Sequence, residues 1–190
     1  RTPEDLQGLK LRTSSAWAEI APKLGASTVV LPGSEVFSAL ERKVVDAIEW
    51  GGPGGNLEAG FVKIAPYIMM PGLHSPAAVH DCIVNKNVWE RIPEKDQALL
   101  ELAGELAMLK TYLGYAKMDL AAYDTLKESS SAEMIIVDDS LVQAVKTASA
   151  EWAAEQSADN EWFKKVYEDQ AAFLASLSGL SEFRFAPGGR

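Results

Sequence analysis

The sequence predicts an α/β fold in which short parallel strands alternate with helices, followed by a long helix and further C-terminal helices. Two patterns support this fold class. Over residues 9–50, apolar runs typical of strands alternate with helix-like spacing of apolar residues. From residue 94 to about residue 127, leucines recur at intervals of three and four, which is helical spacing. Strands that alternate with helices are typical of parallel sheets buried on both faces.

The first elements are a strand at residues 9–13 and a helix from about residue 15 to residue 24. Ser14 or Ser15 is the expected cap of this helix, because a serine hydroxyl accepts a hydrogen bond from a free backbone N–H at a helix start. Gly25 is expected to end it. The helix therefore leads from the first strand to a second strand at residues 28–31.

A second unit of strand, helix and strand follows directly. Pro32, Gly33 and Ser34 are expected to form a turn, with Ser34 as the N-cap of the next helix. A third strand is expected at residues 44–50. The helix before it has an apolar face made of Val36, Phe37, Leu40 and Val44.

Residues 51–56, Gly-Gly-Pro-Gly-Gly-Asn, interrupt the alternation. We interpret them as a loop outside the core, because glycine lets the backbone approach a ligand or a second domain closely. The motif lacks the Gly-Lys-Ser/Thr ending of a phosphate-binding loop, which disfavours nucleotide binding.

The rest of the chain adds strands first and then long helices. Further strands are expected at residues 67–70, 79–84 and 133–137. The helix at residues 94–127 would be about 50 Å long, and a helix of that length usually braces two lobes or packs on a partner chain. Two more helices are expected at about residues 140–156 and 160–177, before an irregular tail at residues 183–190. We expect one compact unit without repeats.

Composition and charge exclude several functional classes. Apolar residues make up 47% of the chain, which is enough for a core. The net charge is −9 and no basic run is present, so nucleic-acid binding is not expected. No stretch approaches the roughly 20 apolar residues that a membrane span requires. The single cysteine, Cys82, lies in an apolar run, where a thiol is expected to behave as a small hydrophobic residue.

Arg12 ends the first predicted strand and is a candidate ligand-binding residue. A guanidinium group can bind a carboxylate through two parallel hydrogen bonds, which a lysine cannot do. A structural ion pair with one of the 27 acidic residues is the alternative interpretation.

Glu49 and Trp50 end the third predicted strand, just before the glycine-rich segment. A carboxylate at the end of a buried strand requires a cation. That cation is either Arg12 or a bound Na⁺ or Ca²⁺ ion, which prefer carboxylate and carbonyl oxygens. Trp50 either stacks on a ligand or fills the core.

The remaining candidate residues show no pattern typical of a catalytic site. His74 and His80 are separated by a proline turn, and their spacing matches no zinc motif. We expect His74 at a hinge or pocket wall and His80 as a strand residue. Trp89, Trp152 and Trp162 are expected to be packing residues. No arrangement of nucleophile and base is evident, which disfavours an enzyme.

The three segments in order resemble the solute-binding proteins of TRAP transporters (tripartite ATP-independent periplasmic transporters), the DctP family. The family pattern is a Gly-Leu-Lys-x-Arg strand, a Ser-Glu-Val-aromatic-x-Ala-Leu helix and a Val-Asp strand that ends at the ligand. The matching segments here are residues 8–12, 34–40 and 45–50. Residues 49–53 and 67–74 are similar to the TakP-like branch, which binds 2-oxo and 2-hydroxy acids together with a metal ion. The likeness covers about residues 3–175.

This resemblance implies a periplasmic-binding-protein-like type II lobe with a parallel or mixed sheet. Residues 1–92 would form the ligand-binding lobe, residues 94–127 the connecting helix, and residues 128–190 a strand with packing helices. Such receptors contain two α/β lobes, so the chain would be a partial unit from which the N-terminal lobe is missing.

The resemblance also implies roles for individual residues. Arg12 would hold the ligand carboxylate. Glu49 would bind a metal ion, with the backbone carbonyl of Trp50 as a second ligand and the indole as a pocket wall. Ser75, next to His74, stands where a carboxylate or amide is expected, and serine is a weaker metal ligand. Phe37 would line the pocket or, equally, belong to the core.

The implied function is an extracytoplasmic receptor that binds a small 2-oxo or 2-hydroxy monocarboxylate, such as pyruvate or lactate, with a sodium or calcium ion and no prosthetic group. The receptor would be periplasmic, would deliver its ligand to a TRAP membrane permease, and would dimerise through the long helix. Two alternatives are a sensor or scavenger with the same fold and an α/β enzyme that acts on oxo acids.

Overall fold

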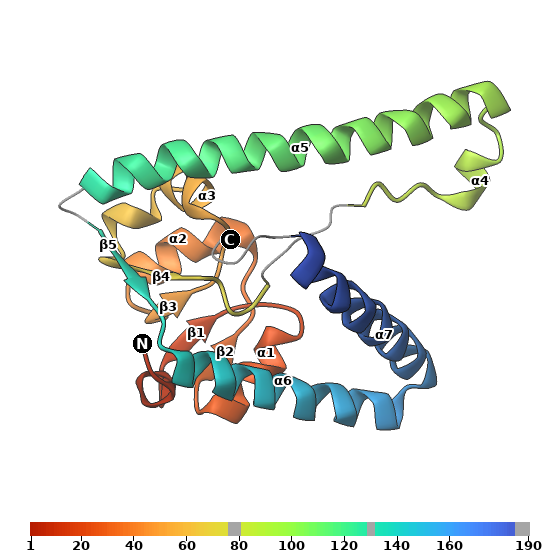
Figure 1. Ribbon diagram of the computed structural model, residues 1–190. Coiled ribbons are helices and arrows are strands. Elements are labelled where there is room, and N and C mark those ends of the chain that lie inside the picture. The colour runs from red at the N-terminus through yellow and green to blue at the C-terminus, as the bar shows by residue number, and fades with distance from the viewer. Residues whose placement is uncertain (76–80, 129–131, 185–190) are drawn as a thin grey trace.

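A three-stranded parallel sheet organises the N-terminal part of the chain (Figure 1). The computed structural model describes residues 1–75, 81–128 and 132–184. The central strand is β1 (Lys10–Arg12), with β2 (Ser27–Val29) on one side and β3 (Ala47–Ile48) on the other. Both pairings are parallel, as predicted. Only β1 is largely buried; β2 is an exposed edge strand, so the expected burial on both faces was wrong for β2.

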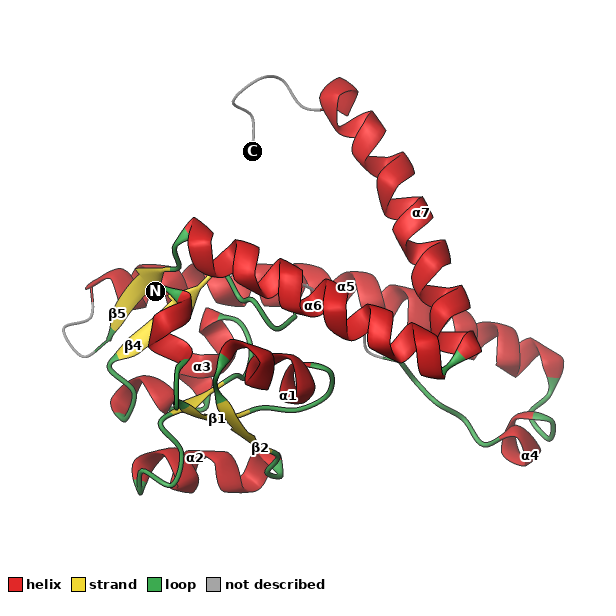
Figure 2. Cartoon of the chain, turned by 90° about the horizontal axis from the view of Figure 1, so that it is seen from below, coloured by secondary structure: helices red, strands yellow, loops and turns green. Residues whose placement is uncertain are grey.

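The helices that connect these strands lie on opposite faces of the sheet (Figure 2). Helix α1 (Trp17–Ile20) and the 3-10 helix η2 (Ala21–Leu24) lead from β1 to β2, and α2 (Gly33–Glu41) leads from β2 to β3. The chain thus crosses β1 on its way from β2 to β3. Open α/β sheets bind ligands beside the carboxyl ends of their strands at such a switch point.

The starts of both helices differ from the prediction, whereas Gly25 ends η2 as expected, with a left-handed φ of 89°. Helix α1 begins at Trp17 and is not capped by a serine; Ser15 takes a left-handed turn with φ of 55°. Helix α2 begins at Gly33 with Pro32 as its cap, so Ser34 lies inside the first turn. Because α2 ends at Glu41, Val44 lies beyond its apolar face and is exposed.

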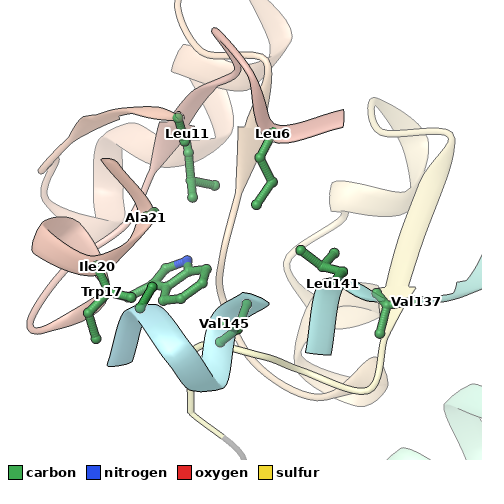
Figure 3. Close-up of a cluster of buried hydrophobic side chains, with 10 residues drawn as sticks. Leu6, Leu11, Trp17, Ile20, Ala21, Val137, Leu141 and Val145 are labelled. Atoms are coloured by element: carbon green, nitrogen blue, oxygen red, sulfur yellow. The ribbon is translucent and has the colours of Figure 1, made fainter. Parts of the chain in front are cut away.

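The largest hydrophobic cluster joins one face of the sheet to a helix from the far end of the chain (Figure 3). Trp17 of α1 and Leu11 of β1 lie in it together with Leu141 and Val145 of α6 (Asp139–Asp159). Leu6 of the 3-10 helix η1 (Pro3–Leu6) also contributes. This cluster fixes α6 against the N-terminal sheet.

A second cluster covers the opposite face of the sheet. It is formed by Val36 and Leu40 of α2, Val45, and Phe61 of the 3-10 helix η3 (Phe61–Lys63). Ile48 of β3 packs against this cluster, whereas its neighbour Ala47 packs against the first one. The alternation along β3 is that of an extended strand between two apolar layers.

A smaller parallel sheet is formed by β4 (Tyr67–Met70) and β5 (Glu133–Ile136). In the sequence, these strands are separated by α5 (Glu94–Glu128), the long helix that the leucine spacing predicted. Only the C-terminal end of α5 is buried, at Ala122 and Leu126. Leu126 packs there with Val62 and residues of both strands.

Part of the glycine-rich segment is a helix rather than a loop. Helix α3 (Pro53–Glu58) begins inside the segment, and Pro53 and Gly54 are buried. Proline suits the first turn of a helix, where its missing N–H is not needed. The glycines allow close approach, as predicted, but the partner they approach is α5.

The segment before α5 contains a short helix, α4 (Lys86–Trp89), whose start is capped by the Asn85 side chain. Residues 81–85 form no strand, so the expected strand at 79–84 was wrong for that part. Residues 79 and 80, including His80, lie outside the described residues. Cys82 is exposed and not a buried hydrophobic residue.

Helices α6 and α7 (Glu161–Arg184) confirm the two predicted C-terminal helices. Trp152 packs on the first cluster and Trp89 is half-buried, but Trp162 is 73% exposed, which contradicts a packing role. Figure 2 shows α7 and the N-terminal part of α5 projecting from the α/β body, so the expected compact unit was wrong. Within the described part of the chain, none of the helices is both long and apolar enough to cross a membrane.

Leu141 tests whether α6 is held by the first cluster. Its side chain is fully buried, so Leu141→Ala should lower the free energy of unfolding by about 3 kcal/mol through lost burial and a residual cavity. Urea denaturation of the complete gene product measures this change. Val44→Ala, at an exposed position after α2, is the control and should change stability little; equal effects would contradict the assigned core.

Candidate functional site

The carboxyl ends of the three parallel strands bring Arg12, Leu31 and Glu49 together. Arg12 is the last residue of β1 and pairs in register with Val29 of β2 and Ile48 of β3. Leu31 and Glu49 follow those neighbouring strands. The central position of β1 thus places the guanidinium of Arg12 between the ends of two other strands.

Arg12 is buried and held by oxygen atoms from both sides. Its Nε and Nη2 atoms donate to the Leu31 carbonyl at 3.2 and 2.8 Å. Its Nη1 atom donates to the backbone carbonyl and the Oε1 atom of Glu49, each at 3.3 Å. The structure therefore contains the ion pair that was one interpretation of Arg12.

The Glu49 carboxylate contacts three side chains. Besides Arg12, Oε1 accepts a hydrogen bond from the Ser14 hydroxyl at 3.3 Å. Oε2 lies 3.2 Å from His74 Nε2. The Glu49 side chain is only 14% exposed, so these groups replace much of its hydration.

Aromatic residues close one side of this cluster. The guanidinium carbon of Arg12 lies 5.7 Å from the centre of the Trp50 ring, within range of a cation–π interaction. Trp50 contacts Phe61 edge-on at 5.2 Å and remains 39% exposed. The indole is therefore both a packing residue and an accessible wall. A side chain at Gly33 would come within 3.2 Å of the indole.

The other two predicted site residues are Phe37 and Ser75. Phe37 stacks on Phe61 at 6.1 Å and packs against the second cluster, behind Trp50. Ser75 follows His74 in the chain and is exposed. The structure thus joins Arg12, Glu49, Trp50 and His74 directly.

Sequence reasoning missed the Ser14 hydroxyl and the Leu31 carbonyl. Ser14 follows Arg12 at the same edge of the sheet, which is a usable signal, although its place before a helix makes Ser14 or Ser15 the expected cap. The carbonyl of Leu31 carries no signal in the sequence, since every residue has one.

The oxygen atoms at this edge fit a hard cation only in part. Glu49 supplies the carboxylate oxygens that Na⁺ and Ca²⁺ prefer. Arg12 competes for one of these oxygens and His74 for the other. Among the residues that the structure describes, no group of three or more His, Cys, Asp or Glu side chains could hold a metal. Further oxygens would have to come from the backbone, the ligand or other parts of the protein.

Residues 1–160 match the family described as bacterial extracellular solute-binding protein, family 7, also called DctP. The chain belongs to this family. The match includes the sheet, α5 and α6, and therefore every residue of the site. It bears out the resemblance found in the sequence.

The chain is also similar to individual solute-binding proteins. A monocarboxylate 2-oxoacid-binding periplasmic protein of Nostoc is 31% identical over 177 residues, covering 93% of this chain and 48% of the relative. A TRAP periplasmic solute-binding protein of Pseudoalteromonas atlantica, solved with bound sodium and pyruvate, is 29% identical. It superposes with a TM-score of 0.86 and covers 97% of this chain and 56% of the solved one.

A third relative was solved as a dimer. This TRAP transporter solute-binding protein of Bordetella bronchiseptica, with calcium and picolinate in its active site, has 28% identity and a TM-score of 0.88. The alignment covers 96% of this chain and 54% of that structure. The chain thus spans about half the length of the relatives it matches, and the fold class predicted from the sequence is confirmed.

Removal of Arg12 tests the energetic role of the charge cluster. Arg12→Ala leaves a nearly buried carboxylate without its cation and should lower the free energy of unfolding by about 3 kcal/mol. Lys23→Ala breaks the exposed pair with Glu155 and should cost less than about 1 kcal/mol. Urea denaturation of both variants of the complete gene product gives the comparison. A loss for Arg12→Ala no larger than for Lys23→Ala would contradict this role.

Proposed function

We propose that this family-7 chain contains the carboxylate-binding site of a TRAP transporter receptor for a small 2-oxo or 2-hydroxy monocarboxylate, such as pyruvate or lactate. The observation that carries the proposal is the buried guanidinium of Arg12 at the carboxyl edge of the sheet, held in place by the Leu31 carbonyl. The similar proteins from Nostoc and Pseudoalteromonas are described with ligands of this class.

Arg12 is oriented before any ligand binds. Two of its nitrogens are held by one backbone carbonyl, so little side-chain freedom is left to lose on binding. The second proton of Nη2 takes no part in these contacts. A ligand carboxylate that bonds to Nη2 and Nη1 would replace Glu49 Oε1 as the partner of Nη1.

This exchange explains why a metal ion would accompany the ligand. Arg12 and Glu49 together carry no net charge, so an incoming carboxylate adds a negative charge to a site with little water. Sodium or calcium would offset that charge, with Glu49, the Trp50 carbonyl and Ser75 as proposed ligands. The Pseudoalteromonas and Bordetella structures contain sodium and calcium, respectively.

The pocket around Arg12 and Glu49 would be shaped by Trp50, His74 and Phe37. Trp50 offers an accessible apolar wall beside Arg12, and Phe37 supports it through Phe61. His74 can donate a hydrogen bond to Glu49 or to a ligand oxygen. Such a site binds and releases its ligand, and binding without catalysis is the role that we propose.

The proposed assignment of regions follows the predicted boundaries. Residues 1–92 would form the ligand-binding lobe, residues 94–127 the connecting helix and residues 128–190 the packing region. In the complete receptor, a second lobe would close over the ligand by a hinge motion, which the ligand favours through its higher affinity for the closed state. The receptor would act in the periplasm and pass its ligand to a membrane permease.

We also propose that the protein forms a homodimer through α5. Several large apolar side chains of α5 are about half exposed or more, and an apolar surface of this extent usually marks an interface. They include Leu99, Leu102, Leu106, Leu109 and Leu113. The dimeric Bordetella relative supports this arrangement.

Calorimetric titration with pyruvate tests the proposed ligand. The complete gene product should bind pyruvate in CaCl₂ or NaCl, and Arg12→Lys should weaken binding about 100-fold, because lysine cannot form two parallel bonds in a plane. Glu49→Gln should remove most of the gain in pyruvate affinity that calcium provides, and it should have a smaller effect on the free energy of unfolding. Arg42→Lys, at the exposed residue that follows α2, is the matched control and should bind normally.

Failure of the wild-type protein to bind pyruvate, lactate or 2-oxobutyrate under any of these conditions would contradict the proposed ligand class. Normal binding by Arg12→Lys would contradict the proposed role of Arg12. Equal affinity with calcium, with sodium and after exchange of both for a bulky organic cation would contradict the metal.

Sedimentation analysis tests the dimer. The complete gene product should sediment as a dimer, and Leu109→Glu should shift it to the monomer, because a charge would be buried in an apolar interface. Val44→Glu places the same charge on another exposed apolar residue and should leave the dimer intact. A monomeric wild-type protein at high concentration, or a dimer that tolerates Leu109→Glu, would contradict this proposal.

A further inference from the structure

The contact between α5 and α3 links the long helix to the ligand site. Asp119 of α5 is half-buried, and its Oδ1 atom accepts a hydrogen bond from the backbone N–H of Gly54 at 2.9 Å. Pro53, the first residue of α3, has no N–H, so Gly54 carries the first donor of this helix. Gly52, at the N-cap position, has no side chain to accept it. Asp119 therefore supplies the cap from another helix.

Two glycines make this approach possible. A Cβ atom at Gly52 would lie 2.5 Å from Asp119 Oδ2, and a Cβ atom at Gly54 would lie 2.6 Å from Met118 Cγ. The backbone of Gly52 has φ of −65°, which any residue can adopt, so closeness to Asp119 is the reason for a glycine there. The unusual glycine content of residues 51–56 is thus explained in part by contact with α5.

Helix α3 in turn holds the segment that carries the site residues. The Asn56 side chain donates to the Gly51 carbonyl at 2.9 Å, which ties α3 to the residue next to Trp50. A Cβ atom at Gly55 would lie 4.0 Å from the Trp50 ring, so this face of α3 borders the indole. A shift of α3 would therefore move Trp50 and, with it, Glu49.

We propose that Asp119 is a positioning residue for the ligand site: it holds α3 and thereby sets the placement of Trp50 and Glu49 relative to Arg12. The inference rests on the proposed function, since placement matters only if a ligand binds at this edge. Through the same contact, a movement of α5 would change the affinity of the site for its ligand. Asp119 itself does not contact Arg12, Glu49 or Trp50 in any interaction that the structure shows.

Two measurements on the complete gene product separate this proposal from the proposed function. Hydrogen exchange of the Gly54 amide, followed by NMR, reports the contact without any ligand. Asp119→Ala should raise that exchange rate at least tenfold, whereas Asp119→Asn, which keeps an acceptor oxygen, should preserve most of the protection. Calorimetry with pyruvate in CaCl₂ measures the effect on ligand affinity. Asp119→Ala should weaken pyruvate binding about fivefold, a factor of the size that loss of a helix cap produces, and Asp119→Asn should keep most of the affinity.

Matched variants exclude a general loss of stability. Asp124→Ala removes an exposed aspartate from the same helix and should leave both measurements unchanged. Gly52→Ala should weaken pyruvate binding in the wild-type background, because the new methyl group displaces Asp119. In the Asp119→Ala background the same change should have little further effect. This non-additivity is a signature that independent structural damage does not produce.

The outcomes are distinct. Unchanged Gly54 exchange in Asp119→Ala overturns the proposal, whether or not pyruvate binds. Increased exchange with unchanged affinity for pyruvate also overturns it, because the contact would then be structural only. If the wild-type protein binds none of pyruvate, lactate and 2-oxobutyrate, the proposed function fails, and the positioning role fails with it even if Gly54 loses its protection.

Discussion

The buried guanidinium of Arg12 is the group on which the arrangement of the site depends. Three strand ends meet around it, and each contributes an element: the arginine itself, the Leu31 carbonyl and the Glu49 carboxylate. A charge that is 10% exposed must be satisfied by fixed partners, so the positions of β2 and β3 and the position of Arg12 constrain one another. In the proposed function, Arg12 exchanges one anionic partner, Glu49, for another, the ligand carboxylate.

The hydrophobic clusters hold the sheet that carries this edge from both sides. One cluster fixes α6 beneath the sheet and the other fixes α2 above it, so β1 lies between two packed layers. Trp50 extends the second layer to the charges through its edge-on contact with Phe61. By contrast, α5 and α7 carry many exposed apolar side chains, and contiguous apolar patches of this kind are typical of surfaces that contact other segments or chains.

Much of the fold and the central site residues could be predicted from the sequence. The parallel strands, the long helix and the proximity of Arg12 and Glu49 follow from local periodicity and from the geometry of strand ends. The errors arose where tertiary contacts override local preference. Residues 53–58 are helical despite their glycines because α5 packs against them, and Asp119 supplies a cap that no local pattern reveals. Trp162 has helical spacing, but its side chain is 73% exposed and only Lys165 of the same helix is recorded over its ring among the described residues.

In the proposed function, a ligand carboxylate replaces the Glu49 side chain as the partner of Arg12. A crystal structure of the complete gene product with pyruvate and calcium tests this exchange. We expect the pyruvate carboxylate on the Nη atoms of Arg12, with the Leu31 carbonyl still bound to Nε and Glu49 turned toward the metal. Pyruvate bound elsewhere, with the pair of Arg12 and Glu49 intact, would contradict the exchange.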